Sequence, residues 1–350
     1  MALENRYDFI MLFDVENGNP NGDPDAGNAP RIDSESGYGY VTDVCLKRKI
    51  RNYVELVKEG EAGYNILIKP DKALNSKFTA AYEAEGLKTK NNGRNEDDVK
   101  KARAYMCKNY YDVRTFGAVM STGNDPCGIV RGPVQLNFAR SISPIDIEDI
   151  TITRQARTTD ERQETGQTEM GKKSIIPYAL YRAEGYVSAA LANKTTDLSE
   201  ADLELLWEAI INMFENDHSA ARGKMCMRKL YVFKHSNILG NCPSHLLFEK
   251  IKVDEENEIP RCFDDYKSWG ENIFVTKANL LHDRVHDPEK SYTGRGKKVY
   301  TSVPVYNDDE QYNLYGVTDC IELKKDKTGI TIKDDNQRYK LTIVKRLSGR

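Results

Sequence analysis

The sequence predicts an α+β fold, because strand-like and helix-like segments follow one another through residues 7–240 in the order β-α-β-β-α-β. Residues 7–13 are rich in aromatic and aliphatic side chains without a helical period, which indicates a mostly buried strand at the centre of a sheet. Residues 44–58 and 199–214 instead repeat apolar side chains at helical spacing. Each predicted helix therefore has one face that can pack against the sheet.

The first strand leads into a long loop and then into the first helix. Residues 16–28 contain Asn-Gly, Asn-Pro and Asp-Pro pairs, which exclude regular structure. Thr42 or Asp43 supplies an N-cap, and one face of the helix over 44–58 is apolar. The other face carries three cations: Lys47, Arg48 and Arg51. This face indicates an anionic partner, and the alternative is a solvated helix surface.

Residues 112–120 and 132–145 are predicted to form the next two strands, joined by a turn. Residues 199–214 form the second helix, behind a Ser199 cap, and residues 227–235 form the last strand. The complete order is that of ferredoxin-like and RNA-recognition-motif folds. A sheet of this kind presents polar side chains to RNA, and the second of the middle strands offers Arg140 and Ser141.

Two stretches do not fit this order. Residues 59–111 alternate Gly, Lys, Asn and Glu, with a helix expected around 97–110, and indicate an insertion that is either a contact surface or simply solvated. Residues 151–174 have too few apolar side chains to form a core and should protrude as a hairpin or arm. Met170 stands in this arm without a core to join, and two lysines follow it, Lys172 and Lys173.

Composition excludes several classes of protein. A net charge of −3 argues against a uniformly basic nucleic-acid coat, so any such contact depends on local patches. One further patch is formed by Arg222 and Lys224, which flank Gly223. Seven cysteines without a CxxC pair predict reduced thiols. With no signal peptide and no apolar run of about 20 residues, the expected location is cytoplasmic.

No metal or cofactor is expected. The fragments Cys242-Pro243-Ser244-His245 and His282-x-x-x-His286 each supply two ligands, with no evident pair to complete a zinc site.

Several of these segments resemble a known family. Residues 13–25, Phe-Asp-Val-Glu-Asn-Gly-Asn-Pro-Asn-Gly-Asp-Pro-Asp, and residues 41–51, Val-Thr-Asp-Val-Cys-Leu-Lys-Arg-Lys-Ile-Arg, resemble the repeated backbone subunit of type I-C CRISPR Cascade complexes. Residues 131–135 and 217–223 extend the resemblance. These subunits belong to the repeat-associated mysterious protein (RAMP) superfamily.

The resemblance implies one hand-like unit. It has an RNA-recognition-motif-like palm (about 5–58, 112–145 and 176–240), an inserted finger (about 59–111), a thumb (about 146–175) and a C-terminal elaboration (about 241–350). On a thumb, Lys172 and Lys173 are expected to hold phosphate, and Met170 is either a wedge between bases or an ordinary surface methionine. The implied partners are CRISPR RNA, target DNA through the guide, further copies of the chain, other Cascade subunits and the recruited effector nuclease.

Two functions follow from these observations. The first is a non-catalytic scaffold that oligomerises along CRISPR RNA and presents it to target DNA in antiviral defence. The second is a RAMP-type endoribonuclease that processes CRISPR RNA, with Asp14, Glu16, Asp23 and His218 as candidate groups. The scaffold is favoured, because no nucleophile stands beside a base in the sequence. The RNA-binding candidates are Lys47, Arg48, Arg51, Arg140, Ser141, Met170, Lys172, Lys173, Arg222 and Lys224.

Overall fold

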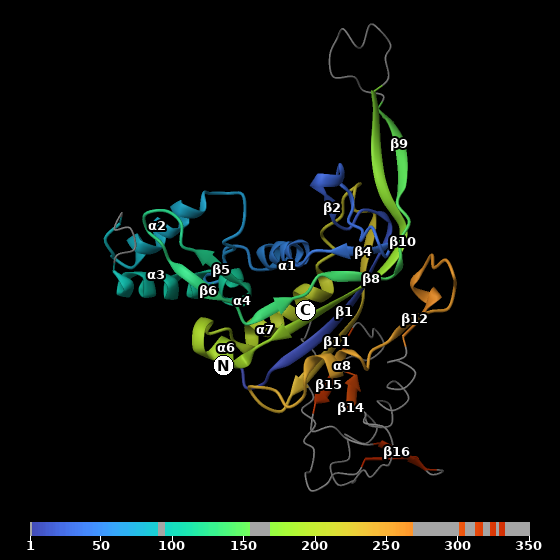
Figure 1. The fold of residues 1–350 in the computed structure, drawn as a ribbon. Helices are drawn as coiled ribbons and strands as arrows, with labels where there is room; N and C mark the ends of the chain where they lie inside the picture. Colours follow the sequence, from blue (N-terminus) through green and yellow to red (C-terminus); the bar gives the residue numbers. More distant parts are fainter. Residues whose placement is uncertain are drawn as a thin grey trace.

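The computed structural model describes residues 2–89, 95–154 and 169–268, and four strands at 301–304, 312–317, 323–326 and 329–332. Its helices and strands form the mixed fold that the sequence predicts, organised around an antiparallel sheet (Figure 1). No helix in this part of the chain has the length and apolarity that crossing a bilayer requires.

The first strand, β1 (Tyr7–Gly18), lies in the middle of the sheet, as its apolar composition predicts. It pairs antiparallel with β10 (Glu169–Val187) on one side and with β11 (Lys224–His235) on the other. Beyond β10 come β7 (Val134–Leu136), β8 (Ala139–Pro144) and β4 (Tyr38–Val41). Beyond β11 come β15 (Tyr312–Val317), which is parallel to it, and β14 (Thr301–Pro304).

Two helices cover one face of this sheet. Helix α1 (Asp43–Val57) is capped by Thr42, whose side chain accepts from the Cys45 N–H, and α7 (Glu200–Asn212) begins with a Ser199 capping box. Both helices bury their apolar stripes in one core with β1, where Trp207 meets Phe9 edge-on at 5.1 Å. After β10 the chain forms α6 (Ala189–Leu191) and a π-helical turn (Ala192–Thr196) before α7.

A second core lies on the other face of the sheet. It contains Ile10, Leu12 and Leu180 from the central strands, and Leu247 and Phe248 from outside the sheet. The elements on this side are α8 (Ser244–Phe248), β12 (Val253–Glu255), a 3-10 turn (Phe263–Asp265) and β13 (Tyr266–Ser268). Burial on both faces explains the long apolar runs of β1 and β10.

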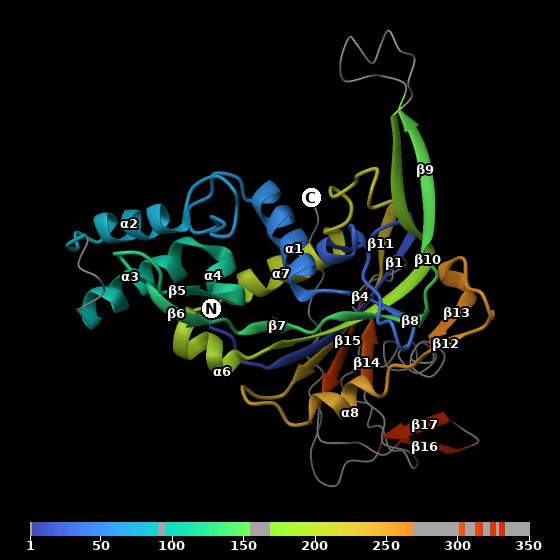
Figure 2. The same cartoon turned by 45° about the horizontal axis from the view of Figure 1, so that its top comes forward.

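The predicted insertion is larger than the sequence indicated. A helical subdomain with its own core contains α2 (Leu74–Ala84), α3 (Glu96–Asn109), α4 (Tyr111–Phe116), β5 (Gly117–Met120) and β6 (Gly128–Arg131). Figures 1 and 2 show it at the end of the sheet away from the arm. The core joins Phe78 and Met106 to Val130, so the subdomain continues well past residue 111.

The predicted strand over 112–120 is therefore wrong. Its first half is helix α4, all six residues of which are buried, so the segment shows no amphipathic period from which a helix can be recognised. Its second half, β5, pairs with β6 outside the central sheet. The central elements follow one another as β1, α1, β8, β10, α7 and β11, so the two middle strands are β8, which lies within 132–145, and β10, rather than 112–120 and 132–145.

The predicted arm is present. Strand β9 (Glu148–Arg154) pairs antiparallel with the first part of β10, and this ribbon projects beyond the sheet (Figure 1). Short elements complete the fold: β2 (Gly22–Asp23), a 3-10 turn (Pro24–Ala26), β3 (Ala29–Pro30), β16 (Leu323–Asp326) and β17 (Gly329–Ile332).

Several predicted features lie outside the described residues. They are the tip of the arm, residues 90–94 of the predicted insertion, the pair His282 and His286, and much of the predicted C-terminal elaboration.

Candidate nucleic-acid interface

The end of β1 packs backbone to backbone against the loop that precedes β11. The Asn19 N–H donates to the Ala221 carbonyl at 2.9 Å. A Cβ on Gly18 would lie 1.9 Å from the Arg222 carbonyl oxygen, and Gly223 has a φ of +65° besides its own close contact with Asn17. Only glycine fits at these two positions. Two of the segments that carry the sequence resemblance, 13–25 and 217–223, therefore lie side by side.

The carboxylate of Asp217, whose side chain is 9% exposed, holds this surface together. Asp217 accepts a hydrogen bond from Arg222 at 2.7 Å and pairs with the Lys49 ammonium. Lys49 is almost fully buried and was not among the predicted site residues. Its position three residues after Leu46 and four before Tyr53, on the packed face of α1, is the signal that could have found it.

The base of the arm reaches the same place. The Lys173 ammonium donates to the Ala220 carbonyl, and Lys224 forms an exposed ion pair with Glu16 at 3.0 Å. Arg222, Lys173 and Lys224, three of the predicted residues, thus lie around the 217–224 loop. We call this loop with Lys49, Lys173, Arg222 and Lys224 the basic loop cluster.

Lys47, Arg48 and Arg51 on α1 do not form the exposed cationic face that the sequence predicts. Arg51 donates to Asp112 at 2.8 Å, and the side chains of this pair are only 10% and 1% exposed. Arg48 donates to the Ile68 carbonyl at 2.6 Å, and burial lowers the pKa of its guanidinium. Lys47 pairs with Asp43 at 2.9 Å. The expectation of a free cationic face is wrong, because the helical subdomain packs against this side of α1.

Arg140 and Ser141, two further predicted RNA-binding residues, differ in their exposure to solvent. Ser141 is buried, where its hydroxyl accepts from the Gly39 N–H and donates to the Ser143 carbonyl, so it is a structural residue rather than one presented to a ligand. Arg140 points the other way. Its side chain is 61% exposed, with the guanidinium 4.6 Å from the centre of the Tyr38 ring.

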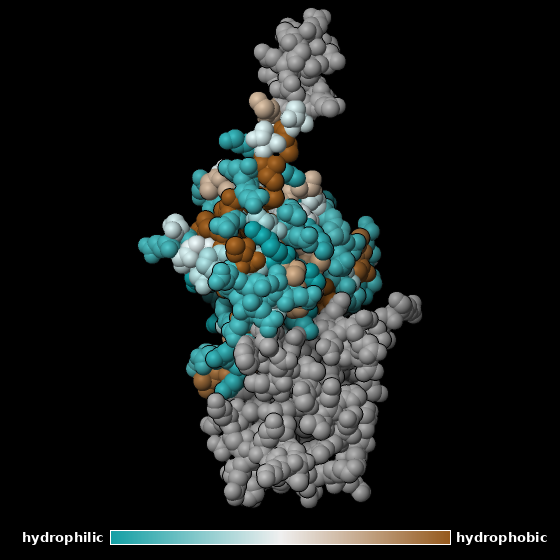
Figure 3. Space-filling model, turned by 90° about the vertical axis from the view of Figure 1, so that its right-hand side faces the viewer, coloured by the Kyte–Doolittle hydropathy of each residue, from teal (hydrophilic) through white to brown (hydrophobic). Residues whose placement is uncertain are grey.

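The arm has two unlike faces. In its register Met170 lies opposite Thr153 and Lys172 opposite Thr151, so these four side chains share one face. Lys173 lies opposite Ile150, on the other face. Met170 is 76% exposed. Apolar surface is visible along the arm in Figure 3, and the exposed apolar residues there are Ile150, Ile152 and Met170.

The four candidate catalytic groups have separate surroundings. Asp14 is buried and accepts from Tyr178 Oη and Arg228 Nε, and burial raises the pKa of its carboxyl. Glu16 pairs with Lys224, and Asp23 caps the 3-10 turn that follows it. His218 is exposed on the loop of the basic loop cluster.

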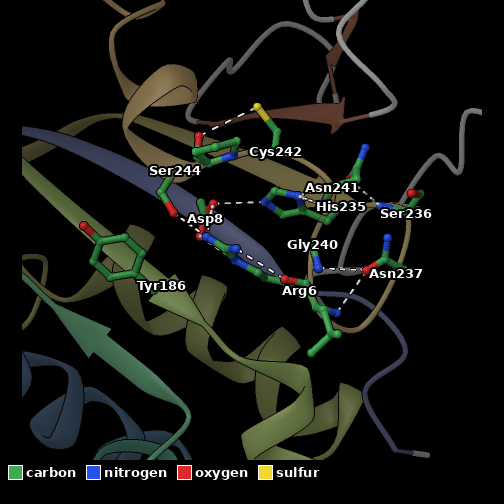
Figure 4. A network of polar contacts seen from close by, with 12 residues as sticks. Arg6, Asp8, Tyr186, His235, Ser236, Asn237, Gly240, Asn241, Cys242 and Ser244 are labelled. Carbon is green, nitrogen blue, oxygen red and sulfur yellow. Dashed lines mark hydrogen bonds and ion pairs between the residues drawn. The ribbon is translucent and has the colours of Figure 1, made fainter.

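A buried polar network lies elsewhere on β1 and β11 (Figure 4). Asp8 accepts from Arg6 and is 2.9 Å from His235 Nε2, while the Ser244 hydroxyl contacts Arg6 rather than the histidine. His235 Nδ1 accepts from the Asn241 N–H. The Ser244 hydroxyl has no base beside it, so the network does not form a nucleophile–base pair. Its role is to hold residues 235–244 against β1. Within the described ranges, no three His, Cys, Asp or Glu side chains form a group that could hold a metal ion.

Comparison with known proteins adds a family. Residues 5–269 match the family model described as CRISPR-associated protein Cas7. A curated relative from Haloferax volcanii, CRISPR-associated protein Cas7, is 26% identical in an alignment 253 residues long that covers 66% of this chain and 71% of that protein.

Among solved structures, a chain of a CRISPR RNA-guided surveillance complex, pre-nicking, is similar at 12% identity with a TM-score of 0.40, covering 62% of this chain and 75% of that one. A chain of another CRISPR RNA-guided surveillance complex has 12% identity and a TM-score of 0.39, covering 81% and 85%.

Proposed function

The chain belongs to the CRISPR-associated protein Cas7 family, and from this premise we propose that it is a backbone subunit that binds CRISPR RNA in a surveillance complex of type I-C. Several copies line the guide RNA, and the complex pairs the guide with target DNA in the cytoplasm. Other subunits and an effector nuclease are its further partners.

The basic loop cluster is the observation that carries this proposal. Arg222, Lys173 and Lys224 project around a loop whose backbone is fixed against the end of β1. Phosphates are bound by such cations and by backbone N–H groups, with little dependence on base sequence. A guide RNA, whose sequence varies while its backbone does not, needs binding of this kind.

The fold supports the same function. The order β11-β1-β10-β8, with α1 and α7 on one face, supports an RNA-recognition-motif-like palm. The helical subdomain is then the finger and the β9–β10 ribbon the thumb. On the thumb, Lys172 holds phosphate while Met170, on the same face, separates neighbouring bases.

We propose further that the subunit is not catalytic. Asp14 is held by Tyr178 and Arg228, and Glu16 by Lys224, so neither stands beside the exposed His218 as an acid–base partner. Incubating pure protein with repeat RNA, with and without divalent metal, should give no cleavage. Cleavage that His218→Ala abolishes would favour the endoribonuclease instead.

The decisive experiment measures RNA affinity against salt concentration. The double variant Lys172→Ala/Arg222→Ala should lower the slope of log K against log salt by about one for each phosphate that the protein no longer neutralises. Lys100→Ala is the matched control, because it removes an exposed lysine from the helical subdomain. Wild-type protein that neither copurifies with guide RNA nor shows a salt slope would refute the proposal.

A further inference from the structure

Aromatic side chains lie at the surface where β4 and the start of β8 form the edge of the sheet, with Phe138 exposed and Tyr38 and Tyr40 half-buried. The rings of Tyr40 and Phe138 are stacked with an interplanar angle of 7° and centroids 6.3 Å apart, and Phe138 is 56% exposed. Beside them the Arg140 guanidinium lies over the Tyr38 ring. We call Tyr38, Tyr40, Phe138 and Arg140 the aromatic platform.

Strand register places the platform on the face away from α1 and α7. Tyr40 pairs with Arg140 across β4 and β8, and Arg140 pairs with Arg182 across β8 and β10. The alternating neighbours Val41 and Ala139 point into the core beneath the two helices. The platform side chains therefore project to the opposite side, where the described residues leave them partly open.

An open groove of about 800 Å³ lies over β10, and one of the residues that line it is Arg182, the cross-strand neighbour of Arg140. Its floor is formed by Arg182, Glu184 and Tyr186, and residues 245–254 line the rest of it. Asn137, next to Phe138, donates to the Tyr186 hydroxyl at 3.0 Å, which joins the platform to the groove.

The charges of this region are nearly balanced. Arg182 pairs with Glu184 at 2.9 Å, and Arg140 lies 3.9 Å from Asp33. The groove wall carries lysines at 250 and 252 and acids at 249 and 254. A surface with stacked rings and little net charge is suited to bases rather than to phosphates.

The platform is linked to the proposed guide-binding surface through the loop after β1, whose Asn19 N–H donates to Ala221. Tyr40 stands two residues before Thr42, whose N–H and hydroxyl both bond to the Asn21 side chain in the loop after β1. We propose that the aromatic platform stacks unpaired bases of a single nucleic-acid strand that passes from the basic loop cluster toward the groove. This inference rests on the proposed function, and it adds a base-contacting site to a surface that otherwise grips phosphates.

The test compares three single variants of the full-length protein in anisotropy titrations with a labelled single-stranded RNA. Phe138→Leu keeps an apolar side chain but removes the ring and should weaken binding by about 5-fold to 150-fold, the range that stacking one base contributes. Phe138→Tyr should bind like the wild type. Ile129→Ala, which trims an exposed apolar residue of the helical subdomain, is the control. The salt slope should be unchanged in Phe138→Leu, because the variant keeps every cation that meets a phosphate.

Ultraviolet crosslinking identifies the strand. In the guide-loaded complex, the tryptic peptide over 132–140, which ends at Arg140 and contains Phe138, should carry crosslinked nucleotide. Crosslinks to the guide, or to an added complementary DNA strand, decide which of the two lies on the platform.

Wild-type affinity in Phe138→Leu, without crosslinks in this peptide, would overturn the platform while leaving the proposed function standing. If Phe138→Leu binds RNA normally but fails to assemble with other subunits, the platform is a protein-binding surface and the base-stacking proposal is overturned. Absence of RNA binding by the wild type would instead refute the proposed function itself.

Discussion

Replacing Arg51 by alanine is expected to destabilise the fold rather than simply to weaken RNA binding. The side chain lies on α1, where its spacing with Lys47 and Arg48 predicts a shared cationic face. In the structure its Nε donates to Asp112 at 2.8 Å, and its guanidinium also lies 5.3 Å from the centre of the Phe116 ring. The variant would remove the cation that balances a buried carboxylate.

The expected loss of unfolding free energy depends on the hydrogen bonds that Asp112 retains in the variant. Removing one partner of a buried ion pair costs roughly 3–5 kcal/mol, because the remaining charge is left without compensation. Asp112 retains two backbone donors, the N–H groups of Leu67 at 2.8 Å and Ile68 at 3.2 Å. We therefore expect the low end, about 3 kcal/mol of unfolding free energy.

Urea unfolding followed by circular dichroism measures this cost. With an m-value of about 3 kcal/mol/M, the midpoint should fall by about 1 M. Arg48→Ala is the matched control, since it removes the same charge from the same helix but breaks only the hydrogen bond to the Ile68 carbonyl, worth about 1 kcal/mol. Equal midpoints for the two variants, together with RNA binding lost only in Arg51→Ala, would refute this reasoning.

Three further outcomes are expected. Met170→Ala should change RNA affinity by less than about threefold, because phosphate contacts supply most of the affinity. The same variant should remove a periodic pattern of base reactivity along the bound guide. Uniform base reactivity in the wild type would contradict the role of Met170 as a wedge. Gly18→Ala should displace the 217–224 loop, because a Cβ would lie 1.9 Å from one of its carbonyl oxygens, and should weaken RNA binding at least about tenfold; a fully active variant would contradict the fixed loop. Alkylation at pH 8, followed by peptide mass spectrometry, should modify the exposed Cys262 and spare the buried Cys107. Burial raises the pKa of the Cys107 thiol to about 11, so about one thiol in a thousand is ionised at pH 8. Equal labelling of the two cysteines in the folded protein would contradict the packed core of the helical subdomain.

Local patterns were enough to predict several elements of the fold. The apolar run of β1, the caps and apolar stripes of α1 and α7, and the polarity of the arm each depend on neighbouring residues, and the structure confirms all of them. A segment buried on every side has no such local signature. This is why α4 was predicted as a strand. The pairing of β10 with β1 joins residues more than 150 positions apart, which no local pattern can show.

The sequence by itself was enough to identify the cations and glycines around the candidate interface. It was also enough to identify the protruding arm that carries Met170. The tertiary structure decided which of the cations are buried in ion pairs and which stay at the surface, where Arg222 and Lys224 are 39% and 63% exposed. Arg51 is held by Asp112, 61 residues away, and Lys49 by Asp217, 168 residues away. Helical spacing shows the direction in which a side chain leaves its own helix, but only the packing of distant segments places a carboxylate in its path.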